Sequence, residues 1–324
     1  MDIELRPLRL AEIFDRIFQL YRARFKLFLG IAAVSTTVEL AWNLTNMVTG
    51  HWLNKSPLAL TARQATTSVL LIVGWAFVFA AAALCLGATN RALAAIYDGK
   101  PTSIAQAFSE LRPNWLRCIW VNTLTFVIAW GSVILVLIGT ITAIVLAKRA
   151  ATVGQANTLT AVYGATGLLL LLAAPLCMWL TLRYSLAVPA CVQESLKTVQ
   201  SLKRSVFLAK GTQGRILLLL LIVVAAQSMV GVVLMSPVFA VFVRSQGHAS
   251  PAATAYLLVA GALTSALIKP IYCIGLTLFY LDARVRKEGF DLERMLDRSM
   301  LDRSGSDAPL EGIATTVPTR GPAF

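Results

Sequence analysis

Residues 69–88 read VLLIVGWAFVFAAAALCLGA, which is twenty residues without a charged, amide or hydroxyl side chain. Because a helix rises 1.5 Å per residue, about 20 apolar residues cross the roughly 30 Å hydrocarbon core of a bilayer. Runs of this kind recur along the chain, and they are continuously apolar rather than alternating, which favours helices over a β-barrel. We predict six spans: Leu27–Val48, Thr67–Ile96, Leu116–Leu146, Leu159–Leu182, Ile216–Val243 and Ala252–Leu281.

The composition of the whole chain agrees with a membrane protein. Its 324 residues are 57% hydrophobic and 14% charged, with a mean hydropathy of +0.71. Soluble domains carry about 25% charged residues, so the composition excludes a soluble enzyme, a disordered chain, a disulfide scaffold and a coiled coil. The predicted fold class is all-α: six transmembrane helices in three hairpins, with amphipathic interfacial helices on the cytoplasmic side.

The basic residues predict the orientation. Of the 29 Lys and Arg residues, 23 fall in the N-terminal segment, the second and fourth connections and the C-terminal tail, whereas 5 fall in the other connections. By the positive-inside rule both termini are expected to lie on the cytoplasmic side of the membrane. The N-terminus has no apolar core typical of a signal peptide, so the first span is expected to stay in the membrane. Although the net charge is +13, the bases flank the spans, so no nucleic-acid partner is expected.

The segment before the first span has the pattern of an amphipathic helix. Apolar residues recur at helical spacing between Leu10 and Phe25. A helix of this kind lies in the headgroup layer, where basic residues contact anionic lipid. The expected headgroup contacts are Arg9, Arg16, Arg22, Arg24 and Lys26. The chain then divides into this helix (1–26), a six-helix domain (27–282), a juxtamembrane helix (283–303) and a disordered tail (304–324), with Gly289 ending one helix and Asp291 capping the next.

A weak internal repeat accompanies these short segments. The pattern Pro-x-x-apolar-Ala-x-x-Phe begins at Pro7 and again at Pro101, each time before a span, and Leu196–Lys210 is a looser third copy. Either the chain consists of three units, each an amphipathic helix followed by a hairpin, or short cytoplasmic helices simply look alike.

Among the polar residues inside the predicted spans, four form a candidate polar layer: Glu39, Asn43, Gln227 and Lys269. Glu39 and Gln227 lie about 18 Å from the cytoplasmic ends of their spans, and Lys269 about 20 Å. Because charges in a bilayer are costly, this polar layer predicts one of three arrangements. Glu39 and Lys269 form a pair that lines a substrate or proton path, they form a structural pair between the first and last spans, or Glu39 faces water at the outer interface.

Other features predict packing rather than chemistry. Pro270 is expected to kink the last span, and the carbonyl it frees beside Lys269 is a weaker candidate for a site. The five cysteines are read as small apolar fillers: Cys85, Cys118, Cys177, Cys191 and Cys273. Motifs for hydrolases, metal centres and nucleotide binding are missing, so we expect no enzyme activity, no metal and no cofactor.

Three stretches carry a resemblance to a known family: ELRPLRLAEIFDRIFQLY (4–21), SLAVPACVQE (185–194) and LDARVRKEGFDLE (281–293). Together they resemble bacterial polytopic proteins grouped with the membrane domain of glycerophosphoryl diester phosphodiesterase. The resemblance implies a six-span membrane domain. It implies no phosphodiesterase activity, because neither His51 nor His248 begins the His-Arg-Gly pattern of the catalytic domain.

These observations predict a non-catalytic inner-membrane protein that binds or organises anionic lipid, or that serves as a scaffold for a membrane protein partner. The alternative is a transporter of a small solute or lipid that uses the Glu39–Lys269 layer.

Overall fold

The computed structural model describes residues 9–55, 60–149, 155–244 and 251–289, and all regular structure in these ranges is helical. Six helices are long and apolar enough to cross a membrane. They are α2 (Phe25–Lys55), α3 (Leu60–Tyr97), α5 (Trp115–Arg149), α6 (Gln155–Tyr184), α9 (Gln213–Arg244) and α10 (Pro251–Glu288). The predicted all-α fold with six spans is confirmed, and this is the architecture of a multi-pass membrane protein.

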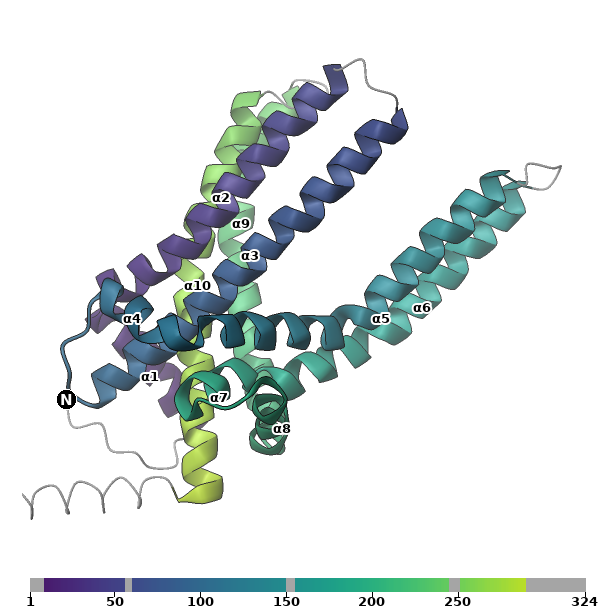
Figure 1. Ribbon diagram of the computed structural model, residues 1–324. Coiled ribbons are helices and arrows are strands. Elements are labelled where there is room, and N and C mark those ends of the chain that lie inside the picture. Colours follow the sequence, from purple (N-terminus) through teal and green to yellow (C-terminus); the bar gives the residue numbers. More distant parts are fainter. Residues whose placement is uncertain (1–8, 56–59, 150–154, 245–250, 290–324) are drawn as a thin grey trace, which may run out of the picture.

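The long helices form two arms that diverge from one end of the molecule (Figure 1). Helices α2, α3, α9 and α10 pack into the first arm, and the α5–α6 hairpin is the second. Away from their shared end the arms expose large apolar side chains, such as Ile72 and Leu171. Because a bilayer solvates such surfaces, the arms do not need to close on each other in order to hide them.

Short helices gather where the two arms meet, and we call this end the base. It consists of α1 (Leu10–Ala23), α4 (Ile104–Leu111) with the 3-10 turn η1 (Arg112–Asn114), α7 (Ala187–Glu194) and α8 (Thr198–Ala209), together with the adjoining ends of the long helices. Helix α7 is the most enclosed, since residues 187–192 are all buried against α3, α5, α8 and α10. The base therefore contains much of the protein's closely packed core.

Helices α1, α4 and α8 begin in the same way. In each, the backbone N–H of the N-cap residue donates to the side chain three positions later: Arg9 to Glu12, Ser103 to Gln106, and Lys197 to Gln200. This satisfies a donor that a helix start leaves without a partner. The three N-cap residues are spaced at intervals of 94 residues, and each short helix precedes one hairpin. This regular spacing favours the interpretation of three repeated units.

A cluster of charged side chains joins three elements of the base. Both carboxylate oxygens of Glu194, at the end of α7, accept from Arg204 of α8 at 2.9 and 3.0 Å. The hydroxyl of Tyr280 in α10 donates to the same carboxylate at 2.6 Å, and Arg204 donates onward to Glu288 at 2.7 Å. Burial alone would lower the pKa of Arg204, but its hydrogen bonds to Glu288 and Glu194 raise that pKa above its ordinary value, which keeps the guanidinium charged.

The last helix ends as the sequence predicts. Gly289 adopts a positive φ of 64°, a conformation that glycine adopts without steric cost, and its N–H bonds to the carbonyl of Val285. Helix α10 runs without interruption to Glu288, so the first residues of the expected juxtamembrane helix continue the last span. The rest of 283–303, the expected cap at Asp291 and the tail at 304–324 lie outside the described residues.

Substituting Glu194→Gln tests the cluster. The amide keeps the shape of the side chain but loses the charge that pairs with Arg204, and Glu194 is only 17% exposed. We expect the unfolding free energy to fall by about 2 kcal/mol, the size of a hydrogen bond to a charged group. The measurement is thermal unfolding in detergent, with the exposed Glu110→Gln on α4 as the control; equal midpoints for the two variants would contradict this role.

Candidate functional site

Glu39 and Lys269 meet inside the first arm. The Lys269 ammonium forms an ion pair with Glu39 of α2, and it also lies 3.5 Å from the hydroxyl of Ser35, one turn away on the same helix. The two charged side chains are 22% and 25% exposed, so the pair is largely enclosed. Of the three predicted arrangements, the structure shows a paired one, and this pair joins the first span to the last.

The other two residues of the predicted layer lie elsewhere. Asn43 is exposed one turn beyond Glu39 on α2. Gln227 is exposed on α9, where it lines a cavity of about 150 Å³ between α9 and α10 with Gly231, Gly261 and Thr264. Similar depth on three helices was the only signal for a common layer, and depth does not specify which way a side chain points around its helix.

A second polar contact crosses the first arm at a position that the sequence analysis did not single out. The Thr277 hydroxyl of α10 donates to the Asn90 side-chain oxygen of α3 at 2.8 Å, and both residues are fully buried. The Asn90 amide also donates to the Leu86 carbonyl, so its polar atoms are satisfied. Hydrogen bonds between spans of this kind hold helices together in a bilayer.

Pro270 is buried inside α10, which is helical on both sides of it. In the turn before the proline, the carbonyl of Leu267 accepts a hydrogen bond of 2.9 Å from the hydroxyl of Tyr21. Burial raises the pKa of Tyr21, which keeps this hydroxyl protonated as a donor. This contact fastens α1 to the last span, but it does not involve the carbonyl that Pro270 frees, which belongs to Ala266, four residues before the proline.

The position of α1 corrects one expectation. Part of its apolar face packs on the protein rather than on lipid, because Ile13, Ile17 and Leu20 are buried and the helix packs along α10, whereas Phe18 is exposed. The predicted headgroup residues still lie at the base: Arg9, Arg22, Arg24 and Lys26 are exposed, and Arg16 is half-buried. The pattern of a helix on a membrane and that of a helix on a protein core are the same in sequence, since both need one apolar face.

One of these residues, Arg24, lies at a cavity. The cavity has a volume of about 370 Å³ and lies between the end of α1 and the end of α3. Arg24 and Lys100 supply its charged groups, and neither has an ion-pair partner among the described residues. The remaining lining is Leu20, Ala23, Ile96, Gly99 and Pro101. Two unpaired cations around one hollow are suited to an anion.

The repeat explains why the hollow is there. In the second unit, Arg117 donates to Asn114 and to the Ser195 carbonyl, which closes the corresponding junction. One interval of 94 residues earlier, these three positions are Ala23, Leu20 and Pro101, all of which line the cavity.

The third unit closes the same junction by another contact. There Lys287 donates to the carbonyls of Phe207 and Lys210 at the end of α8. The position equivalent to Lys287 in the first unit is Gly99, which has no side chain to fill the space. Sequence reasoning missed Lys100 because it lay in a connection, but the regular interval of the repeat could have identified this open junction.

Candidate chemistry is sparse in the described chain. The described residues contain no group of three or more His, Cys, Asp or Glu side chains that could hold a metal. The five cysteines are free and buried, which agrees with their prediction as packing residues.

Comparison of the chain with known families, with curated proteins and with solved structures finds no match. The resemblance to the membrane domain of glycerophosphoryl diester phosphodiesterase therefore stays a prediction from the three sequence stretches.

Substituting Glu39→Gln tests the ion pair. The change leaves the Lys269 ammonium enclosed without a counter-ion, and we expect a loss of stability on the order of 3 kcal/mol. The double variant Glu39→Gln with Lys269→Met removes both charges and should recover most of that loss. Thermal unfolding in lipid discs measures both, and Asn43→Ala, exposed on the same helix, is the control.

The stability of this variant also distinguishes a structural role of the Glu39–Lys269 pair from a role in a transport path. A Glu39→Gln protein as stable as the Asn43→Ala control would contradict a structural role and favour a path for substrate or protons.

Proposed function

We propose that this protein is a non-catalytic component of the plasma membrane that binds an anionic lipid at its base, which faces the cytoplasm. The observation that carries the proposal is the cavity between Arg24 and Lys100. A phosphate there gains two charge-assisted hydrogen-bonding partners that otherwise face water. The rest of the lipid lies against the apolar ends of α1 and α3.

The surrounding charge supports the same function. Arg9, Arg22 and Lys26 are exposed at the base. Near an anionic leaflet each such residue contributes about 1 kcal/mol of attraction. Scattered bases act on any anionic surface, whereas a hollow between two cations selects a headgroup that fits it. The cavity is therefore the specific part of the interaction, and the exposed bases are the general part.

Transport of a small solute or lipid is a second candidate. The Glu39–Lys269 pair favours it, since both charges retain some exposure inside a span. This function needs the pair to open, so it is incompatible with a pair that only stabilises the fold.

The double variant Arg24→Gln with Lys100→Gln tests the lipid proposal. Purified in polymer discs with its native lipid, the unaltered protein should carry anionic lipid above the bulk proportion. The loss of two cations worth about 1 kcal/mol each should reduce that excess by an order of magnitude or more. Lipid mass spectrometry gives the composition, and Lys203→Gln, an exposed base of α8 outside the cavity, is the matched control. An equal lipid composition in both variants would refute the proposal.

Orientation is tested with introduced cysteines, because the native cysteines are buried and should label poorly. Ala62, at the far end of α3, and Lys203, at the base, are both exposed. A membrane-impermeant maleimide should label Ala62→Cys in intact cells and Lys203→Cys only after the membrane is opened. The reverse pattern would place the base outside the cell.

A further inference from the structure

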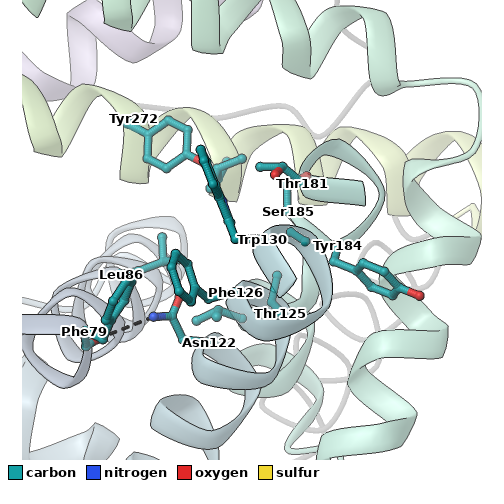
Figure 2. A pocket seen from close by; sticks show the side chains of 13 residues that line it. Phe79, Leu86, Asn122, Thr125, Phe126, Trp130, Thr181, Tyr184, Ser185 and Tyr272 are labelled. Carbon is teal, nitrogen blue, oxygen red and sulfur yellow. Dashed lines mark hydrogen bonds between the residues drawn. The ribbon is translucent and has the colours of Figure 1, made fainter. Parts of the chain in front are cut away.

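A third cavity lies where the two arms join (Figure 2), and we call it the vertex cavity. It has a volume of about 170 Å³ and is lined by residues of α3, α5, α6, α7 and α10 together with the turn between α6 and α7. Figure 2 shows aromatic rings over much of its wall, with small polar groups between them. The lining is Phe79, Leu86, Asn122, Thr125, Phe126, Ala129, Trp130, Thr181, Tyr184, Ser185, Val188, Tyr272 and Leu276.

One buried hydroxyl in this wall lacks a partner. The hydroxyl of Thr125 is buried and makes no hydrogen bond with the described residues. Other threonines in the spans behave differently: the hydroxyls of Thr89, Thr181 and Thr264 each donate to the carbonyl four residues earlier. Since a buried hydroxyl without a partner costs about 1–3 kcal/mol, Thr125 marks a place where a ligand atom would stabilise the protein.

The lining specifies the charge of that ligand. It contains no acidic or basic side chain. Thr181 and Ser185 already donate to backbone carbonyls, and the Asn122 amide lies 3.4 Å from the Phe79 carbonyl. A phosphate or ammonium group would thus be desolvated without a counter-ion, which is costly at this depth. An uncharged group with one hydrogen-bonding atom fits.

The volume of the cavity and its surroundings indicate how much of the ligand fits inside and where the remainder lies. A cavity of about 150 Å³ accommodates a molecule the size of benzene, so 170 Å³ takes one segment of a lipid rather than a whole one. The remainder must lie outside the cavity, and we place it in the bilayer between the two arms, which diverge in Figure 1. A run of aromatic contacts leads there: the rings of Phe79 and Phe126 are 4.3 Å apart and those of Phe126 and Trp130 are 6.2 Å apart, with Trp130 exposed.

We propose that the vertex cavity binds the uncharged polar end of a neutral lipid, with a hydroxyl or ester oxygen of that lipid hydrogen-bonded to Thr125 and its apolar chain lying between the arms. This site is separate from the cavity at Arg24, and its proposed ligand is uncharged rather than anionic. Helix α7 contributes a residue to each of two features. Val188 lines the vertex cavity, and Glu194, the last residue of the same helix, belongs to the ion cluster with Arg204.

The test uses the full-length protein in lipid discs and a diacylglycerol that carries a photoactivatable diazirine on one chain. After illumination, mass spectrometry should find cross-links concentrated on the peptides around Phe126 and Trp130. Thr125→Val keeps the shape but removes the hydroxyl, and should lower this labelling about three- to tenfold. Ala129→Phe fills the cavity and should abolish it. The matched control is Thr142→Val, an exposed threonine on the same helix.

Two further experiments distinguish binding of a neutral lipid from binding of an anionic one. A phosphatidylglycerol with the same diazirine chain should label the vertex weakly, and the double variant Arg24→Gln with Lys100→Gln should leave diacylglycerol labelling unchanged. Equal labelling by both lipids, or labelling that Thr125→Val leaves at the Thr142→Val level, would overturn the proposal. Because Thr125→Val removes a hydroxyl without a partner, its unfolding midpoint should not fall, and a loss of labelling in it cannot be assigned to unfolding.

Discussion

The base depends on one carboxylate. Glu194 brings together α7, α8 and α10 by accepting from Arg204 and Tyr280, and Arg204 extends the connection to Glu288. Helix α7 has too few residues to be stable by itself, so its place between the arms depends on its contacts. The arms diverge beyond the base (Figure 1), and their exposed apolar side chains are suited to contact with lipid. The divergence of the arms is therefore set at the base, where the ion cluster joins α7 and α8 to α10 of the first arm and α7 and α8 pack against α5 and α6 of the second.

Comparison of the three repeated units explains why the first unit contains a cavity. Three units begin with the same capping contact, at an interval of 94 residues. In the second and third units a cation from the chain closes the junction between the short helix and the end of the hairpin. In the first unit the equivalent residues are small or apolar, and Arg24 and Lys100 remain at the rim of a hollow. A bound anion would close this junction by contacting Arg24 and Lys100, whereas Arg117 and Lys287 close the equivalent junctions in the other two units.

Sequence alone predicted the features that follow from continuous patterns. Six apolar runs predicted six spans, and helical spacing with Gly289 predicted the short helix α1 and the end of α10. It could not predict rotations around helix axes, so Gln227 was assigned to a layer it does not join, and the burial of Ile13, Ile17 and Leu20 of α1 against the protein was not foreseen. It also could not find Thr125, because an orphaned hydroxyl differs from a satisfied one only in its neighbours.

In the functions proposed here, the two lipid sites differ in charge. One lies among basic groups at the base, and the other lies among aromatic rings within the spans. The most direct measurement of this account is an electron cryo-microscopy structure of the protein in discs of native lipid. The account predicts headgroup density between Arg24 and Lys100 and elongated density that ends at Thr125 between open arms. Arms closed on each other, with neither density present, would contradict it.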